Sequence, residues 1–513
     1  MMPDIRRLVE ESRKAQSFWA ELPYTERARC MKKAARSLAE KREEITGIIC
    51  RENGKLAVDA LAAEVIPAIM AFSYYIRQGR RFIESQKIRG ANPLMLNKRS
   101  RVVYRPWGVI GIISPWNYPF SIPFSEAVMA LLAGNGVILK TASVTPGCGR
   151  VIASVLEAAG LPGGLFSSVE LPGGEAGPAF INSGVDKLFF TGSTKVGKEL
   201  MALAAARLLP LTLELGGADA ALVRSDADIE RAVSGIIWAG FSNAGQSCGG
   251  VQRVLVHRDI YREFMEELSR RVEALRPGND VSCDLGPLIS LKRKEEVRKQ
   301  VEACLAKGGE IAAQSRAFSL PDGRMAGALE DESLFAPALV LVNVKAGTPI
   351  MDEEIFGPVI AVIPFENDRE ALDIANASPY GLSASVWSRN RKQAKRLAGE
   401  INAGSVMIND HLMSHGLAET PWGGFGDSGL GRTHGEAGFR EMLKARVIVD
   451  DLLPGVKRDL WWQPYSQKVF SGLTALGDFL AGPGLGKRIR AFPGVVRIFL
   501  RTWEKDGDKN RCK

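Results

Sequence analysis

The sequence lacks several features that would place it in other protein classes. No uninterrupted run of about 18 apolar residues occurs among its 513 residues, so we expect no membrane-spanning helix. The first residues run straight into charged positions without the apolar core of a signal peptide. Its seven cysteines are scattered, odd in number and never spaced Cys-x-x-Cys. This argues against a disulfide framework and favours a reduced, cytoplasmic setting.

Histidine is also scarce, with four residues in the chain. His411 and His415 are four positions apart, but no Cys, Asp or Glu joins them at ligand spacing in a segment that resembles a loop. We therefore expect no metal site, and few candidates exist for an imidazole base.

The remaining composition is that of a globular enzyme. A hydrophobic content of 46% and a charged content of 24% over this length predict two or three domains. A helix is predicted over Thr25 to Cys50, with Asn53-Gly54 as its stop. Buried strands are predicted at Val109 to Ile113, Gly136 to Leu139 and Val185 to Phe190. Alternating strands and helices indicate an α/β fold with parallel sheets.

Two short segments indicate covalent chemistry. Glu214 ends a predicted strand in Leu213-Glu-Leu-Gly-Gly217, and Cys248 follows a predicted helix in Gly245-Gln-Ser-Cys248. Such a cysteine can act as a nucleophile and such a glutamate as a base. The structural alternative is a buried cysteine and a solvated surface charge.

Two further strand ends suit a nucleotide. Lys140 ends the predicted strand Gly136 to Leu139, and Ser193 lies where Phe190-Thr-Gly-Ser-Thr turns into a helix. The free N–H groups of a helix start bind anions such as a pyrophosphate. The alternative is an ordinary capped helix.

An ordered set of motifs from about residue 52 to about residue 449 resembles the aldehyde dehydrogenase superfamily. These motifs are Glu52-Asn-Gly-Lys55, Pro115-Trp-Asn-Tyr-Pro119, Gly134-Asn-Gly-Val-Ile-Leu-Lys140, Phe190-Thr-Gly-Ser-Thr194, Leu213-Glu-Leu-Gly-Gly217, Gly245-Gln-Ser-Cys248, Glu353-Glu-Ile-Phe-Gly-Pro358 and Pro421-Trp-Gly-Gly-Phe425. No single motif is decisive, but their combination in this order is highly specific.

The resemblance implies a role for each candidate residue. Cys248 would attack the aldehyde, Asn117 and the Cys248 N–H would hold the oxyanion, and Glu214 would activate water. Lys140 would reach the adenosine ribose, Ser193 the pyrophosphate and Glu354 the nicotinamide ribose. The remaining implied coenzyme contacts are Ile113, Trp116, Gly216 and Phe356.

Ser143 departs from the family pattern, which usually has a glutamate three residues after the lysine that corresponds to Lys140. A glutamate would repel a 2′-phosphate, whereas a serine can donate to one while Lys140 supplies charge. We therefore predict that NADP is accepted. The alternative is that Ser143 binds the ribose of NAD.

The resemblance implies NAD(P)-dependent oxidation of an aldehyde to an acid through a thiohemiacetal and a thioester. Tyr118, Phe241, Ser247 and Phe425 are expected around the substrate and favour aromatic or medium- to long-chain aliphatic aldehydes. The alternatives are a semialdehyde dehydrogenase, a coenzyme A-acylating dehydrogenase, and a non-catalytic structural member. The last would be expected to lack Cys248 or Glu214.

The resemblance also implies three structural parts, with a homodimer or tetramer as the assembly. The expected boundaries are 1–86 and 105–217 for a Rossmann-like coenzyme domain, 218–415 for an α/β catalytic domain, 416–444 for a return to the coenzyme domain, 87–104 and 445–450 for oligomerisation strands, and 454–513 for a C-terminal extension.

The C-terminal extension carries most of the net charge. Residues 456–513 contain 12 Lys/Arg and 5 Asp/Glu, so they account for +7 of the total of +9. Its basic residues alternate with aromatic and aliphatic ones, which suits either an anionic membrane surface or packing on a partner subunit. Nucleic-acid binding is disfavoured by the apolar content.

Overall fold

The computed structural model describes residues 3–90, 95, 97–319 and 325–503, and Cys512 lies outside them. The chain forms two compact units. The larger contains Met1–Glu84 and Tyr104–Lys444, and the smaller contains Ser85–Val103 and Ala445–Lys513.

The first sheet of the larger unit has six strands. Its strands are β3 Val109–Ile113, β4 Gly136–Lys140, β5 Phe166–Val169, β6 Lys187–Thr191, β7 Leu211–Glu214 and β19 Gly429–Leu430. Their spatial order is β19-β7-β6-β3-β4-β5, all parallel except β19, which is antiparallel to β7. β3, β4 and β6 are buried along their whole length, because a parallel sheet is covered on both faces.

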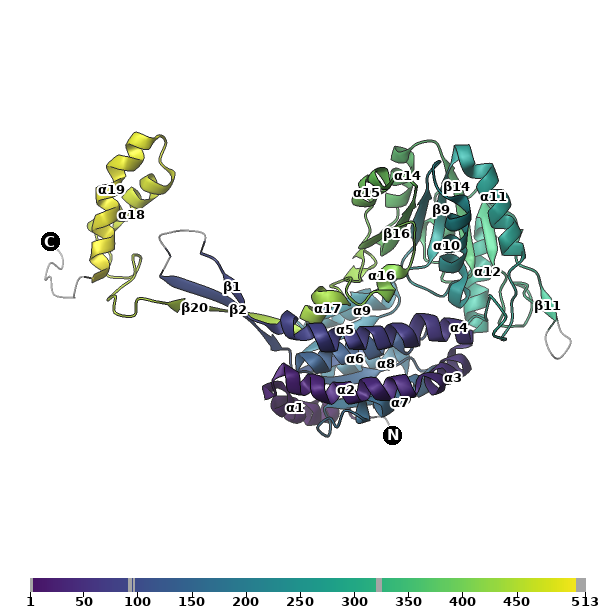
Figure 1. The fold of residues 1–513 in the computed structure, drawn as a ribbon, viewed down its shortest axis with the longest axis horizontal. Coiled ribbons are helices and arrows are strands. Elements are labelled where there is room, and N and C mark those ends of the chain that lie inside the picture. Colours follow the sequence, from purple (N-terminus) through teal and green to yellow (C-terminus); the bar gives the residue numbers. More distant parts are fainter. Residues whose placement is uncertain (1–2, 91–94, 96, 320–324, 504–513) are drawn as a thin grey trace. The chain divides into compact units, whose positions relative to one another are not determined.

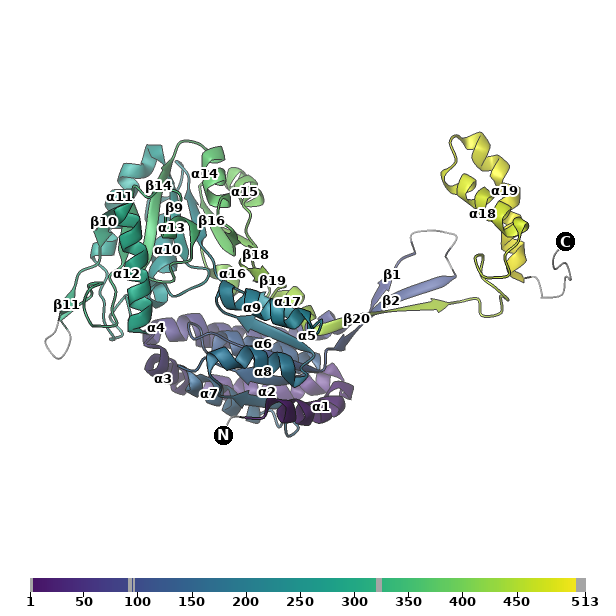
Figure 2. The same ribbon diagram turned by 180° about the vertical axis from the view of Figure 1, so that it is seen from behind.

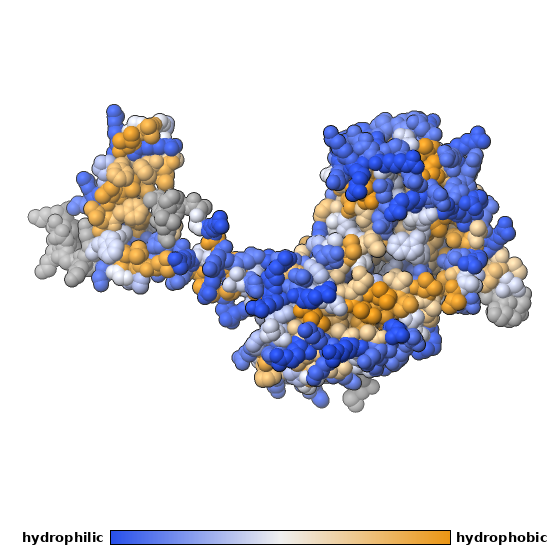
Figure 3. All heavy atoms as spheres, in the orientation of Figure 1, coloured by the Kyte–Doolittle hydropathy of each residue, from blue (hydrophilic) through white to orange (hydrophobic). Residues whose placement is uncertain are grey.

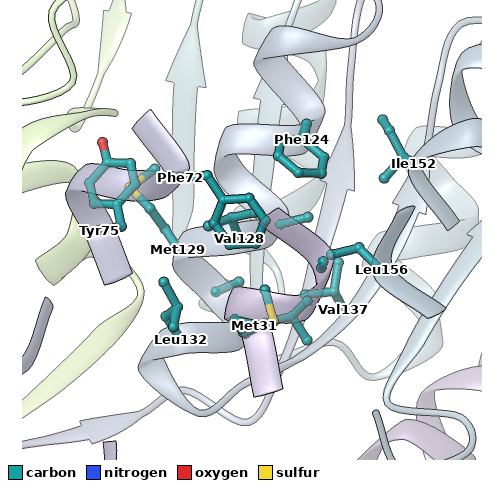
Figure 4. Close-up of a cluster of buried hydrophobic side chains, with 14 of the residues drawn as sticks. Met31, Phe72, Tyr75, Phe124, Val128, Met129, Leu132, Val137, Ile152 and Leu156 are labelled. Carbon is teal, nitrogen blue, oxygen red and sulfur yellow. The ribbon is translucent and has the colours of Figure 1, made fainter. Parts of the chain in front are cut away.

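Helices cover both faces of this sheet (Figures 1 and 2). They are α1 Ile5–Glu21, α2 Tyr24–Glu40, α3 Arg42–Asn53, α4 Ala57–Ala60, η1 Leu61–Val65, α5 Ile66–Ile83, α6 Ser121–Ala133, α7 Pro146–Glu157, α8 Gly173–Ser183, α9 Thr194–Ala205 and α17 Gly435–Glu441. Alternate residues of β3 divide between two cores: Ile112 faces α2, α5, α6 and α7, whereas Ile113 faces α1, α8 and α9. Figure 4 shows the first core, in which the rings of Phe72 and Phe124 meet edge-on at 5.3 Å.

The second sheet of the larger unit has seven strands in the order β10-β13-β14-β9-β8-β16-β17. Their bounds are β8 Asp219–Val223, β9 Val251–His257, β10 Glu310–Gln314, β13 Leu339–Val342, β14 Val359–Phe365, β16 Ser383–Trp387 and β17 Ser405–Ile408. β10 is antiparallel, and the other strands are parallel. The sheet again separates two cores, because Ala221 and Val223 of β8 pack on one face and Ala220 and Leu222 on the other.

The helices around the second sheet are α10 Ile229–Phe241, η3 Ser242–Gly245, α11 Arg258–Glu273, α12 Leu291–Ala306, α13 Pro349–Asp352, α14 Asp368–Asn376, α15 Arg391–Glu400 and α16 Met413–Gly416. Two small ribbons complete the larger unit, namely β11 Phe318–Ser319 with β12 Met325–Ala326 and β15 Tyr380–Gly381 with β18 Phe425–Gly426.

The smaller unit contains a three-stranded sheet and a helical hairpin. The sheet has the order β1-β2-β20, with bounds β1 Gln86–Ile88, β2 Lys98–Pro106 and β20 Leu443–Asp451. The hairpin consists of α18 Gln467–Ala481 and α19 Leu485–Leu500, followed by η4 Arg501–Trp503.

Two features differ from the sequence-based expectations. The helix predicted over Thr25 to Cys50 is two helices, α2 and α3, separated at Lys41, although its predicted stop at Gly54 has the expected left-handed conformation. The helical run Ala57–Ile83 is long and apolar enough to cross a membrane by length and composition, despite Asp59 and Glu64. One such helix is weak evidence for a membrane span, and its inner face builds the core in Figure 4.

Candidate active site

Cys248 lies in the predicted loop beyond α10. After that helix, Asn243, Ala244 and Gly245 all have positive φ, so the chain turns sharply. A Cβ at Gly245 would collide with the backbone of Gly357, so only glycine fits this turn. The sequence Asn243-Ala-Gly245 therefore breaks the helix and presents the following residues in a loop.

The loop of Cys248 meets the end of β7. A Cβ at Gly217 would collide with the carbonyl oxygen of Cys248, so the two backbones are in direct contact. The Cys248 residue is partly exposed, and its thiol has a raised pKa because of burial and then the nearby charges of Glu354 and Glu214. The two segments that the sequence analysis paired are therefore neighbours in the fold.

Asn117 lies against the same loop. Its buried side-chain amide donates a hydrogen bond to the carbonyl of Gln246 at 3.1 Å. Its own backbone carbonyl accepts one from the Asn243 amide at 3.2 Å. Because a side-chain amide carries two N–H groups, one remains for another acceptor near Cys248. Such a donor is what an oxyanion requires.

A buried ion pair fixes the turn that contains Asn117. Lys55 donates to Glu64 at 2.6 Å and to the Asn117 carbonyl at 2.7 Å. The other carboxylate oxygen of Glu64 accepts from the backbone N–H groups of Phe120 and Ser121 at 2.9 and 3.2 Å. Neither residue was assigned a role from the sequence, although a glutamate among the apolar helix positions of Leu61–Val65 is a usable signal.

Glu214 is the last residue of β7, as predicted. Its carboxylate is buried, and neither oxygen has a hydrogen-bond partner within the described residues. Burial raises its pKa well above the ordinary value, Glu126 raises it further, and Arg432 lowers it. A carboxylate with a raised pKa is a stronger proton acceptor once ionised.

The sequence analysis missed Glu126 and Arg432. Glu126 lies inside α6, whose residues are all buried, and burial raises its pKa to about 8. Its Oε2 atom has no partner in the part of the chain that the structure describes. Arg432 donates to the backbone carbonyls of Gly424 and Gly431 at 3.2 and 2.6 Å. A single acidic residue in an otherwise apolar helix was the available signal for Glu126.

Four expected coenzyme residues form two contacting pairs. A Cβ at Gly216 would lie 2.6 Å from the carboxylate of Glu354, which accepts a hydrogen bond from the Gly217 N–H at 3.2 Å. Burial raises the pKa of Glu354 to about 7. The Trp116 and Phe356 rings meet edge-on at 5.5 Å, and Phe356 has a φ of 52°. This positive φ is uncommon for an aromatic residue and holds the ring beside Trp116.

The carboxyl edge of the six-stranded sheet presents Lys140 and Ile113. These residues pair in register at the ends of β4 and β3. The Lys140 side chain is 4% exposed, and its ammonium has no hydrogen bond or ion pair within the described residues. Burial lowers its pKa. An ammonium without a protein partner at this edge can receive a ribose hydroxyl or a phosphate, as at the strand ends of other doubly wound sheets.

The two serines expected at the coenzyme have local partners. Ser193 caps α9, and its hydroxyl accepts from the Val196 N–H at 3.5 Å. Ser143 is exposed and donates to the Leu171 carbonyl at 3.0 Å. To donate to a 2′-phosphate, the Ser143 hydroxyl would therefore have to give up its hydrogen bond to the Leu171 carbonyl.

Aromatic side chains extend from the Cys248 loop. The buried Tyr118 hydroxyl bonds to the Ser247 side chain, and its ring lies 6.2 Å from that of His415. His415 in turn meets Trp422 edge-on at 5.0 Å. Burial lowers the pKa of His415 to about 4, which leaves this ring neutral at pH 7. These three aromatic side chains are therefore uncharged at pH 7.

The other two residues expected around the substrate have different environments. Phe241 belongs to the buried core of the second sheet, whereas Phe425 is 42% exposed beneath the guanidinium of Arg432. No group of three or more His, Cys, Asp or Glu side chains that could hold a metal occurs within the described residues. His411 contacts the Gly249 carbonyl at 3.1 Å, and His415 lies in the one-turn helix α16, where a loop was expected.

Comparison with known proteins gives consistent results. The family model described as "Aldehyde dehydrogenase family" matches residues 2–448. A 4,4'-diapolycopene aldehyde oxidase from Methylomonas sp. is 33% identical over 480 residues, covering 93% of this chain and 87% of that protein. A putative succinate-semialdehyde dehydrogenase (NADP+) 2 from Mycobacterium ulcerans is 34% identical over 467 residues, covering 89% and 88%.

Solved structures share the fold. A putative aldehyde dehydrogenase from Burkholderia cenocepacia aligns with a TM-score of 0.82 and 29% identity, over 90% of this chain and 91% of that one. A betaine aldehyde dehydrogenase from Staphylococcus aureus in complex with NAD+ also aligns with a TM-score of 0.82 and 29% identity, over 90% of each chain.

Proposed function

The chain belongs to the aldehyde dehydrogenase family and uses NAD or NADP, and from this premise we propose that it oxidises an aldehyde to a carboxylic acid at Cys248. The observation that carries the proposal is the contact of the Cys248 loop with Gly217, three residues after Glu214 ends β7, together with the nearby charge of Glu214 at the thiol. It gives one site both a nucleophile and a base.

In the first stage, the Cys248 thiol gives its proton to water, and the sulfur bonds to the aldehyde carbon. The negative charge moves to the former carbonyl oxygen, which accepts hydrogen bonds from the Asn117 amide and the Cys248 N–H. Losing one such donor costs about 100- to 1000-fold in rate. The bound coenzyme supplies a two-electron acceptor, so the thiohemiacetal on Cys248 becomes a thioester.

In the second stage, Glu214 takes a proton from water, and the resulting oxygen nucleophile attacks the thioester carbon. The carbon–sulfur bond breaks, the acid leaves and the Cys248 sulfur is released. The raised pKa of Glu214 supports this role, since its basicity is then closer to that required near neutral pH. This arrangement favours water over coenzyme A as the acyl acceptor.

We propose that the substrate is an apolar aromatic or medium- to long-chain aliphatic aldehyde. Tyr118 and Trp422 are uncharged aromatic side chains beside the Cys248 loop, and the Trp422 ring lies against Gly249. Asp59 of α4 accepts a hydrogen bond from the Asn243 N–H at 3.0 Å. This bond connects α4 to the start of the loop that carries Cys248. From α4 to α5 the exposed apolar side chains are Val58, Leu61, Ile66 and Met70. Figure 3 shows apolar surface along these helices.

The relatives point to two substrate classes. The protein from Methylomonas is named for the aldehyde of diapolycopene, and those from mycobacteria are named for succinate semialdehyde. A semialdehyde carboxylate requires a cation, and the Arg432 guanidinium donates from Nη1 to two backbone carbonyls and lies over the Phe425 ring. This favours the apolar class, with a small acidic semialdehyde as the second candidate.

We propose that the coenzyme edge accepts NADP as well as NAD. The unpartnered ammonium of Lys140 supplies charge at the end of β4, and Ser143 adds none of the negative charge that a glutamate would. An NADP-dependent relative is consistent with this proposal.

We propose that the chain assembles as a homodimer or tetramer through β1, β2 and β20. This sheet has two edge strands, and β20 exposes Val447 and Val449 at 59% each. Exposed apolar edges are covered in stable proteins. Light scattering of the purified chain measures the assembly, and a monomer would contradict it.

Absorbance of reduced nicotinamide tests the catalytic proposal. Purified chain is mixed with hexanal, decanal, benzaldehyde or succinate semialdehyde, with NAD and NADP in parallel. We expect a signal with the apolar aldehydes that disappears in Cys248→Ala. A signal that needs coenzyme A and yields an acyl-CoA product would replace the hydrolytic proposal, as would activity retained in Cys248→Ala.

A further inference from the structure

The helical hairpin of α18 and α19 exposes many of its large apolar side chains. Its small buried cluster contains Leu460, Val469 and Ile498. Several large apolar side chains in this region are between 53% and 75% exposed: Trp462, Tyr465, Phe470, Leu485, Ile489, Phe492, Leu500 and Trp503. Figure 3 shows this apolar surface over the hairpin. Contiguous exposure of this kind marks an interaction site.

The two helices nevertheless pack against each other closely. A Cβ at Gly472 would lie 2.9 Å from the Cβ of Ile498, and a Cβ at Gly494 would lie 2.5 Å from the Cβ of Ala475. Glycine at these two positions lets the helix backbones approach. The hairpin is therefore a formed element, and its exposed residues belong to outward faces.

The exposed residues of α19 follow one stripe. Leu485, Ile489, Phe492, Val496 and Leu500 recur every three or four residues, so they share one face of the helix. The buried Ala491, Val495 and Ile498 occupy a different face. A groove of about 420 Å³ adjoins the stripe and is lined entirely by apolar side chains, including Phe479, Phe492 and Trp503.

Cations flank this apolar stripe. Residues 466–503 contain six Lys/Arg, and Asp478 is the single acidic residue in that range. Asp478 pairs with Lys487 at 2.9 Å. Lys468, Arg490 and Arg497 are exposed and form no ion pair within the described residues. The hairpin thus presents apolar side chains with positive charge beside them.

We propose that the α18–α19 hairpin binds the surface of an anionic lipid bilayer, with its apolar stripe among the acyl chains and its cations at the headgroups. Apolar burial and electrostatic attraction to anionic lipid act together in such helices. A second copy of the hairpin is a poorer occupant of the same face, because it would bring a second net charge of +5 from residues 466–503. The proposal is independent of the catalytic assignment of Cys248.

Vesicle flotation with the full-length chain tests this proposal. The vesicles contain phosphatidylcholine alone or phosphatidylcholine with 30% phosphatidylserine. We expect flotation with the anionic vesicles, weak flotation with the neutral ones, and loss of binding at high salt.

Two variants separate the charge from the apolar stripe. Arg490→Glu/Arg497→Glu should weaken binding to anionic vesicles roughly 30-fold or more, since each basic residue near the surface contributes about a fivefold factor. Ile489→Asp/Phe492→Asp should weaken binding to both kinds of vesicle. The matched control is Lys32→Glu/Arg36→Glu, which makes the same charge change at two exposed positions of α2 and should leave flotation unchanged.

Three outcomes would overturn the proposal. One is no flotation of the wild-type chain with either vesicle. The second is equal loss in the α2 control, which would reduce the effect to net charge. The third is a smaller number of subunits in Ile489→Asp/Phe492→Asp by light scattering, with lipid binding unchanged, because the stripe would then cover a partner subunit. Oxidation of a water-soluble aldehyde should remain at the wild-type rate in every variant, which separates this test from the catalytic one.

Discussion

Lys55 and Glu64 form an ion pair with a 2.6 Å separation, and both side chains are fully enclosed by protein. The same two side chains hold the two ends of the turn at 117–121. Lys55 donates to the backbone carbonyl of Asn117, and Glu64 accepts from the backbone N–H groups at the other end. The proposed oxyanion donor Asn117 is therefore positioned by charges that lie outside the reacting groups.

Removing one partner of this pair should be strongly destabilising. Glu64→Gln or Lys55→Met leaves the remaining charge buried without compensation, so we expect the free energy of unfolding to fall by about 3–5 kcal/mol. Urea unfolding followed by fluorescence measures this change.

The double variant Lys55→Met/Glu64→Leu is the matched control. Without an uncompensated charge it should recover most of the stability, yet kcat should remain low because the Asn117 turn has lost its anchor. Single variants with the wild-type unfolding midpoint would show that the pair has no structural role.

Glu214→Gln should separate the two stages of the reaction. The amide cannot take a proton from water, so hydrolysis should slow by about 100- to 10,000-fold while thioester formation continues. We expect a burst of about one equivalent of reduced nicotinamide per site, followed by a very slow steady state. Mass spectrometry should find the acyl group on the peptide with Cys248.

The exposed carboxylate Glu157 supplies the control for that experiment. Glu157→Gln removes the same charge from the larger unit and should turn over at the wild-type rate. If Glu214→Gln shows no burst and keeps the wild-type steady-state rate, another residue is the base.

Glu126→Gln should change the pH dependence of the rate. Ionised Glu126 disfavours ionisation of Glu214, so the neutral glutamine should lower the pKa of Glu214. Because the base must be ionised, the acid limb of the kcat profile should move to lower pH. An unmoved limb would show that the two carboxyls are not coupled.

The pH dependence of the free energy of unfolding tests the raised pKa of Glu126 independently. Burial raises the pKa of Glu126 from an ordinary 4.5 to about 8. The folded state therefore favours the protonated form, and this contribution to stability is complete below pH 4.5 and is lost as the pH rises towards 8. Relative to the wild type, Glu126→Gln should be more stable at pH 8 than at pH 5, as urea unfolding at both pH values would show.

Local sequence patterns predicted the elements that present the site. The end of β7 at Glu214, helix α10 and the break before Cys248 follow from alternation, capping and glycine. The division of Thr25 to Cys50 into two helices did not, because Lys41, where the helices separate, is an ordinary helix former and carries no local stop signal.

The contacts between distant segments could not be predicted from local patterns. Glu126 and Glu214 are separated by 88 positions, and nothing near either residue specifies that they interact. The partner of Ser143 is likewise decided by where the backbone of Leu171 passes. Burial, which sets the pKa values of these carboxyls, exists only once the sheets and helices have packed.

Ser143→Glu should shift coenzyme use from NADP towards NAD. A carboxylate at the end of β4 would accept hydrogen bonds from ribose hydroxyls but repel a 2′-phosphate, so kcat/KM for NADP should fall at least about tenfold, while that for NAD stays level or rises. Ser143→Gln provides a side chain of equal size without charge and should change the ratio of the two coenzymes much less. An equal effect of both variants would mean that side-chain size, acting through the lost bond to Leu171, decides the preference. A wild-type chain that reduces NAD alone would remove the basis for the NADP proposal, since the charge of Lys140 would then serve only the ribose.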